Sequence, residues 1–207
     1  MLRTVLPFAG VVLVLAILPG PTTAVVMRQA LRSGRRGALA TTAGGQTALL
    51  LWAVAAAFGL SALVAASQVG YDTLRIVGAL VLVGLGVQSL LRSRRTVPHG
   101  DDGPMARVPT SGWRGYRIGL VTDLANPKAA VFAMSFLPQF VPPGAPVLGT
   151  TLLLGPVWVA VDATWYVILL SLVVRSRRLL DRSRGRLERA SGLVLIGLGL
   201  RVALERR

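Results

Sequence analysis

Long stretches without a charged side chain are the feature that most limits how this chain can fold. Residues 4–27 and 37–71 carry no Lys, Arg, Asp or Glu, and shorter uncharged windows cover residues 76–91 and 129–161. A helix needs about 20 mostly apolar residues to cross the hydrocarbon core of a bilayer. The first two windows exceed that length, and neither has the polar stripe of a soluble amphipathic helix. We therefore expect an all-α integral membrane protein.

The composition narrows the function classes. Of 207 residues, 53% are hydrophobic and 15% are charged, against roughly 25% charged in soluble domains. There is no cysteine and one histidine, His99, which excludes disulfides, thiolate metal sites and a Ser-His-Asp triad. We also find no cluster of His, Asp and Glu of the kind that membrane enzymes use. We therefore expect no enzyme, no metal and no cofactor.

The uncharged windows predict six membrane spans. They cover residues 5–27, 38–66, 74–91, 118–140, 148–174 and 190–204. The sixth span is short and contains Arg201, which could reach the interface from a helix end. A signal peptide is the alternative for the first span, but the apolar run is long for one and contains Pro19, Gly20 and Pro21.

The basic residues predict the topology. The net charge is +15, and arginines crowd the first, third and fifth connections while the second and fourth are poor in them. The positive-inside rule places the odd connections in the cytoplasm and both termini outside, although Arg206 and Arg207 weigh against an outward C-terminus. Because the charge follows topology and no aromatic-rich basic face accompanies it, we expect no nucleic-acid partner.

A polar linker at residues 92–117 divides the chain. It is rich in Pro, Gly, Asp and Ser and holds His99, which we interpret as a solvated side chain. Residues 81–91 match residues 194–204 at six of eleven positions, and residues 21–25 resemble residues 127–131. We expect one transporter domain over residues 1–207, with repeat one at about 4–91 and repeat two at about 118–205. Three spans per repeat make the repeats inverted, as in many secondary transporters.

Proline-containing breaks in the first and fourth spans indicate a substrate site. Proline cannot donate to the helical ladder, and the carbonyl groups that it frees are tolerated only inside protein or beside a wet cavity. The alternative is a pair of structural kinks. We predict that the site includes Pro19, Gly20 and Pro21 from the first break and Asn126 and Pro127 from the second.

Three ionisable residues lie inside predicted spans, where burial is expensive. They are Asp123, Lys128 and Asp162. We expect Lys128 to bind a substrate carboxylate, and Asp162 and Asp123 to carry a coupling proton. The alternative is a static Lys128–Asp162 pair. The uncharged side chains expected at the site are Thr22, Thr23, Gln46, Thr122 and Asn126, with Ser135, Trp165 and Tyr166 as weaker candidates.

These residues carry a family resemblance over nearly the whole chain. The chain resembles LysE/RhtB-type amino-acid exporters in its first break, in the Gly34-Arg-Arg-Gly37 loop and in the glycine-rich third span. The most specific similarity is the string from Gly119 through Asn126-Pro-Lys-Ala129 to Phe136-Leu-Pro-Gln-Phe140. The chain departs from the family pattern at Ala48, where a glycine is expected, and at Leu49 and Trp52, where polar residues are common. These departures bear on substrate identity.

The resemblance implies an activity. It implies a multi-pass protein of a bacterial plasma membrane that exports amino acids or close analogues by proton antiport, with a small-molecule substrate and lipid as its partners. A homo-oligomer is left open. The alternatives are export of another small solute or a cation, and a structural membrane subunit that transports nothing.

Overall fold

The computed structural model describes residues 2–18, 20–66, 68–94 and 111–175, together with residues 193, 196, 197 and 200. All regular structure in these residues is helical, which confirms the all-α expectation for this part of the chain. The elements are α1 (Leu2–Ile17), α2 (Pro21–Ala66), α3 (Gln68–Arg94), α4 (Gly112–Leu124), α5 (Pro127–Val131), the π-helix η1 (Phe132–Phe136), the 3₁₀-helix η2 (Leu137–Phe140) and α6 (Val147–Arg175).

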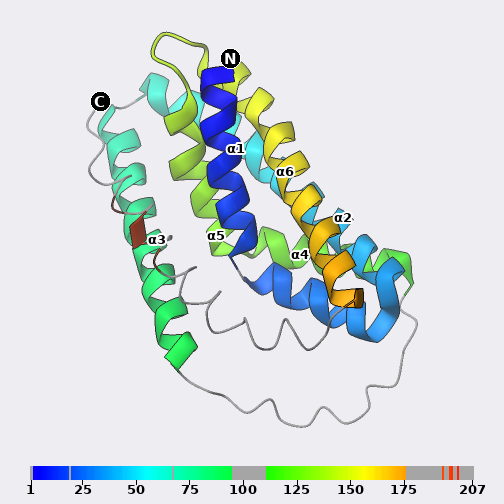
Figure 1. The fold of residues 1–207 in the computed structure, drawn as a ribbon. Coiled ribbons are helices and arrows are strands. Elements are labelled where there is room, and N and C mark those ends of the chain that lie inside the picture. The colour runs from blue at the N-terminus through cyan, green and yellow to red at the C-terminus, as the bar shows by residue number, and fades with distance from the viewer. Residues whose placement is uncertain are drawn as a thin grey trace.

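The helices run alternately between two ends of a bundle. In Figure 1, α1 descends from the upper end, the segment from α5 to η2 rises, and α6 descends again. The upper end holds the start of α1, the turn between α2 and α3 and the loop before α6, whereas α3 and α6 finish at the lower end. Residues 5–17 and 127–140 therefore run in opposite directions.

One predicted boundary is wrong. The first connection was expected as a loop with Arg28 and its neighbours, but α2 is helical from Pro21 to Ala66. Within it only Gly34 leaves the helical region, at φ 70° and ψ −171°, a conformation that glycine adopts without a Cβ penalty. The segment stays helical because arginine is a good helix former. The predicted loop is thus a kinked helix. Most of the predicted sixth span, residues 190–204, lies outside the described residues.

A glycine seam holds α4 against α2. A Cβ atom added to Gly119 would overlap the carbonyl oxygen of Thr41, and one added to Gly44 would overlap that of Tyr116. Small residues spaced four apart allow such close backbone approach between membrane helices. Because Gly115, Gly119 and Asp123 follow one another at intervals of four, the seam carries Asp123 into the protein interior, where it is 4% exposed.

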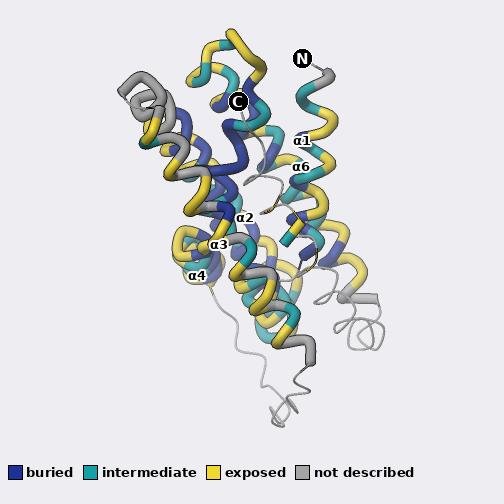
Figure 2. The backbone as a smooth tube through the Cα atoms, turned by 90° about the vertical axis from the view of Figure 1, so that its left-hand side faces the viewer, coloured by how far each residue is buried: buried dark blue, intermediate teal, exposed yellow. Residues whose placement is uncertain are grey.

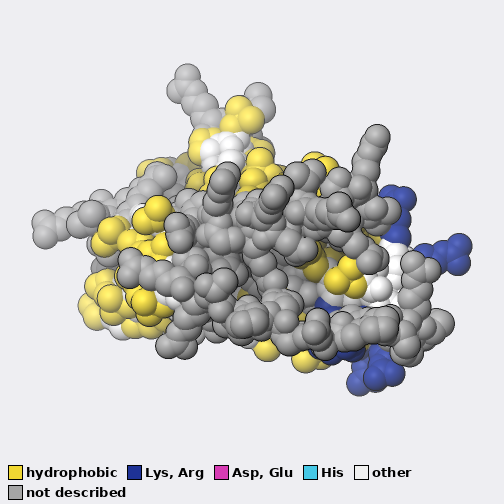
Figure 3. Space-filling model, turned by 60° about the horizontal axis from the view of Figure 1, so that its bottom comes forward, with side chains coloured by type: hydrophobic (Ala, Val, Ile, Leu, Met, Phe, Trp, Pro, Cys, Tyr) yellow, Lys and Arg dark blue, Asp and Glu magenta, His cyan; other side chains and the backbone are white. Residues whose placement is uncertain are grey.

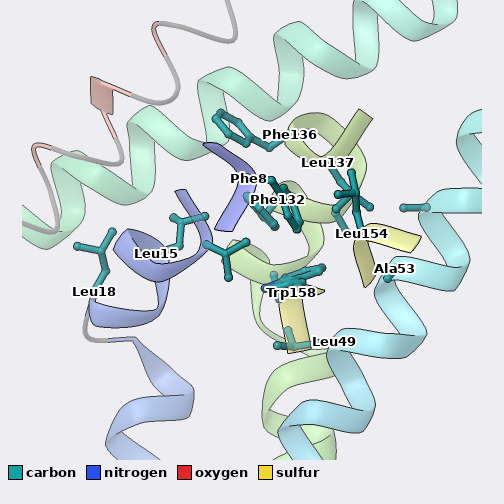
Figure 4. Close-up of a cluster of buried hydrophobic side chains, with 14 of the residues drawn as sticks. Phe8, Leu15, Leu18, Leu49, Ala53, Phe132, Phe136, Leu137, Leu154 and Trp158 are labelled. Carbon is teal, nitrogen blue, oxygen red and sulfur yellow. The ribbon is translucent and has the colours of Figure 1, made fainter. Parts of the chain in front are cut away.

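An aromatic cluster joins α1, η1 and α6. The rings of Phe8 and Phe132 stack at 6.1 Å, and Phe132 meets Trp158 edge-on at 4.8 Å. Figure 4 shows these side chains together with Leu137 and Leu154 between the helices. Pro138 lacks an amide donor, and the helix around it changes from π to 3₁₀ geometry. The cluster packs the upper half of the bundle above the two helix breaks.

Many large apolar side chains are exposed on the helices that the structure describes. Two described helical stretches, Pro21–Gly59 and Val147–Leu172, are long and apolar enough to cross a membrane. Large exposed apolar side chains, including Leu6, Leu80 and Val167, face outward from α1, α3 and α6, and Figure 2 shows exposed positions alternating with buried ones along the helices. Seen from the lower end, the described basic side chains gather toward one margin (Figure 3). This pattern suits a bundle surrounded by lipid.

Candidate functional site

The two helix breaks meet, although about a hundred residues separate them in sequence. Thr22 lies in the first turn of α2, and its hydroxyl donates to Asp123 Oδ1 at 2.5 Å. Asn126 Nδ2 donates both to Asp123 Oδ1 at 2.9 Å and to Thr22 Oγ1 at 3.2 Å. All three residues are buried. The Asp123 carboxylate therefore faces the N-terminus of α2, where the helix dipole favours negative charge.

Lys128 also joins the two breaks, but as a positive charge at the C-terminus of a helix. Its Nζ donates to the carbonyl oxygens of Leu15 at 3.1 Å and Leu18 at 3.3 Å. The last carbonyl groups of a helix have no partner within the helix, and a cation at that end is favoured by the dipole. Lys128 thus caps α1. The cross-helix ion pair with Asp162, left open from the sequence, is not formed between these two described side chains.

The Asn-Pro-Lys sequence has a simple local role at the start of α5. Asn126 is the N-cap, and its Oδ1 accepts from the amide of Lys128 at 3.1 Å. Pro127 occupies the first helical position, where a missing N–H costs nothing. Lys128 follows at the second position, and its long side chain reaches back to α1. One short motif therefore starts a helix and joins the two breaks.

Asp162 is held by Gln46. Gln46 Nε2 donates to Asp162 Oδ2 at 2.7 Å, which links α2 to α6. The other atom of the amide, Gln46 Oε1, is buried without a hydrogen-bond partner. One turn after Asp162, the hydroxyl of Tyr166 lies 3.1 Å from that of Thr23. These contacts place the carboxyl group of Asp162 and the hydroxyl groups of Thr23 and Tyr166 beside the break between α1 and α2.

A small cavity lies where these groups meet. Its volume is about 30 Å³, which is room for a water molecule or two. Its polar lining comes from Gly20, Thr22, Thr23, Asp123, Asn126, Lys128, Asp162 and Tyr166, and its apolar lining from Val12, Leu15, Ala16, Leu49, Ala129, Phe132 and Trp158. An amino acid is larger than this space.

The predicted site residues differ in where they lie. Eight line the cavity: Gly20, Thr22, Thr23, Asp123, Asn126, Lys128, Asp162 and Tyr166. The predicted contacts Thr122, Ser135 and Trp165 do not line it. Gln46 lies behind this lining and contacts Asp162 instead. Pro21 and Pro127 are exposed and do not line the cavity, because each begins a helix whose following residues turn inward. Pro19 is outside the described residues.

The apolar wall was missed from the sequence. Trp158 and Phe132 form most of its aromatic part, and neither was predicted to be a site residue. The spacing could have found them, since Trp158, Asp162 and Tyr166 share one face of α6 at intervals of four, and Phe132 follows Lys128 by the same interval. Without knowing that Asp162 faces a cavity, an apolar residue in an apolar helix carries no such signal.

Comparison with known proteins gives consistent matches. The family model described as LysE type translocator matches residues 13–206. The homoserine/homoserine lactone efflux protein of Salmonella typhi is 32% identical over 72% of this chain and 69% of its own length. The threonine efflux protein of Escherichia coli K12 is 27% identical over the full length of both chains. The uncharacterized membrane protein YrhP of Bacillus subtilis is 23% identical over 99% of this chain and 100% of its own. No solved structure matches the chain.

Proposed function

The chain belongs to the LysE type translocator family, and we propose on that premise that it exports an amino acid or a close analogue in exchange for protons. It is a transporter rather than an enzyme, like its relatives named efflux proteins. We further propose that it is a multi-pass protein of a bacterial plasma membrane. The observation that carries the proposal is the meeting of Lys128, Asp123 and Asp162 around one cavity at the two helix breaks.

The charges suit a zwitterionic cargo. Lys128 Nζ donates two hydrogen bonds to carbonyl groups at the end of α1. Its third N–H is left for a substrate carboxylate. Asp162 accepts one hydrogen bond from Gln46 and has lone pairs left for a substrate ammonium group. The hydroxyl groups of Thr23 and Tyr166 could bind a side-chain hydroxyl such as those of homoserine and threonine, which two relatives are named for exporting. Trp158 and Phe132 would limit the side chain to a small one.

Transport requires the cavity to enlarge. A volume of about 30 Å³ cannot hold an amino acid, so we propose that cargo binding separates the two breaks. Polar contacts join them, namely the Thr22–Asp123–Asn126 group and the Lys128 cap, and so does the apolar cluster that includes Leu15 and Ala129. We propose that two inverted three-helix repeats, each with a broken first helix, move against each other about this point. The antiparallel directions of α1 and the segment from α5 to η2 support that arrangement.

Proton coupling is assigned to Asp162. The test uses purified protein in liposomes with radiolabelled threonine and homoserine. Wild type should accumulate cargo when a pH gradient is imposed and should exchange cargo at equal pH. Asp162→Asn should keep exchange at equal pH and lose accumulation, whereas Asp72→Asn, near the start of α3, should behave as wild type. Full accumulation by Asp162→Asn would contradict the coupling role. Failure of wild type to move any amino acid in a wider panel would point to another small solute, a cation or a protein that transports nothing.

A further inference from the structure

An open groove runs along the outward face of α4. Its volume is about 640 Å³, and it is lined by Trp113, Arg114, Arg117, Ile118, Val121 and Thr122. The opposite face of α4 packs against α2 through the glycine seam of Gly115 and Gly119. The groove is therefore on the side of α4 that points away from the transport cavity, and the proposed function makes no use of it.

The groove changes in polarity along its length. Arg114 and Arg117 are three residues apart and lie on neighbouring positions of the helix surface, in the half of α4 nearer its start. Ile118 and Val121 follow in the other half. Trp113, which is 66% exposed, lies at the same end as the arginines, and Val121, which is 63% exposed, lies at the other. A helix surface with arginines at one end only and apolar side chains beyond them matches the polarity of a lipid molecule.

Both guanidinium groups are available for an anion. No carboxylate of the described residues pairs with Arg114 or Arg117; Ser111 Oγ accepts only the backbone amide of Arg114. Arginine binds phosphate oxygens through paired N–H donors. Exposed Trp113, stacked on Tyr116 at 5.5 Å, is the type of side chain that settles at the level of lipid headgroups.

We propose that this groove binds an anionic phospholipid. Its phosphate lies against Arg114 and Arg117, and an acyl chain lies along Ile118 and Val121. The occupant is a lipid rather than a soluble anion because half of the groove is apolar and the family places the chain in a membrane. Anionic lipids are abundant in the cytoplasmic leaflet. The positive-inside rule places the start of α4 on that side of the membrane.

The test measures quenching of tryptophan fluorescence by brominated lipids in the purified full-length protein. Titration with brominated phosphatidylglycerol and, separately, brominated phosphatidylcholine gives a relative affinity, and the difference between wild type and Trp113→Phe isolates the signal from Trp113. We expect Trp113 to be quenched preferentially by the anionic lipid. The double variant Arg114→Gln/Arg117→Gln should lose that preference by roughly fivefold per arginine. The matched control is Arg35→Gln/Arg36→Gln, which removes two exposed arginines outside the groove and should keep the preference.

Several outcomes would overturn the proposal. Equal quenching by the two lipids would mean that the arginines recognise no headgroup charge. An unchanged preference in Arg114→Gln/Arg117→Gln, with normal elution on size exclusion, would place the lipid elsewhere. Displacement of brominated phosphatidylglycerol by millimolar inorganic phosphate would assign the site to a soluble anion. Absence of Trp113 quenching by either lipid would mean that another part of the chain fills the groove. None of these results depends on whether the protein exports amino acids.

Discussion

Single polar residues at the helix breaks each satisfy a specific unpaired group. Lys128 caps the open carbonyl groups of α1, Asn126 caps α5, and Asp123 collects the donors of Thr22 and Asn126. Buried polar groups without such partners cost about 1–3 kcal/mol each. These polar residues therefore have two roles. They stabilise the broken helices, and they place polar and charged groups at the cavity.

A double-mutant cycle tests how Lys128 is held. Lys128→Met removes hydrogen bonds from a charged donor to the carbonyl groups of Leu15 and Leu18 and should destabilise the protein by about 1.5–3 kcal/mol. Asp162→Asn should cost less, because its carboxylate is not paired with Lys128. Because the two side chains line one cavity without a direct contact, unfolding in detergent, followed by near-ultraviolet circular dichroism, should then show a coupling free energy below the about 3–5 kcal/mol expected when a buried ion pair is broken. A double variant more stable than Lys128→Met alone would indicate a direct ion pair.

Gln46 is expected to position Asp162 rather than to bind cargo. Its Nε2 donates to Asp162 Oδ2 at 2.7 Å, and a hydrogen bond of this kind favours the charged carboxylate. Removing the donor in Gln46→Leu should move the midpoint of the pH dependence of transport to higher pH, with a smaller change in the concentration of half-maximal transport. Gln46→Asn, with its amide one methylene short, should act in the same direction. A changed cargo affinity with an unmoved pH profile would make Gln46 a cargo contact.

At the scale of elements, the glycine seam between α2 and α4 leaves no room for a side chain. A Cβ on Gly119 would overlap backbone atoms of Thr41, and a backbone cannot yield as a flexible side chain can. Gly119→Ala should therefore destabilise the protein by about 1–3 kcal/mol or more and reduce the yield of monodisperse protein. Gly59→Ala in α2 and Gly112→Ala in α4 are the matched controls, since a Cβ there meets nothing within 4 Å. Equal yields for all three variants would mean that the two helices are not in close contact.

The sequence predicted the helix breaks better than the helix boundaries. Proline disfavours the helical conformation in the residue before it and is favoured at the first position of a helix, so the breaks before Pro21 and Pro127 were predictable from local chemistry. Pro156 nevertheless lies inside α6. The arginine-rich segment after Met27 was predicted to be a loop, but a high density of charge does not oppose helix formation. Within α2 the chain changes direction at Gly34, the residue whose φ and ψ are not helical. The polar side of the cavity was found because charges in lipid are conspicuous. Its apolar wall depends on how α6 faces α1, which no local pattern reveals.

For the whole molecule, the distribution of arginines predicts which end faces the cytoplasm. The chain has no cysteine, so single cysteines can be introduced without a background. Pro143→Cys, in the exposed loop at the upper end, should react with a membrane-impermeant maleimide in intact cells, because that loop carries no charge. Arg36→Cys, exposed at the kink of α2, should react only after the cells are opened. The reverse pattern would invert the orientation and would place the α4 groove in the outer leaflet.

The cap that Lys128 forms on α1 also shapes how an unloaded carrier behaves. A cargo carboxylate that binds this ammonium group would share it with the carbonyl oxygens of Leu15 and Leu18, which belong to the same protein. Under the proposed function, these two oxygens compete with the cargo for Lys128. Such competition weakens binding and shortens the stay of each molecule, but it leaves no bare ammonium in the bilayer when the carrier returns empty. A carrier of this design is suited to relieving a surplus quickly, and unsuited to scavenging a scarce solute.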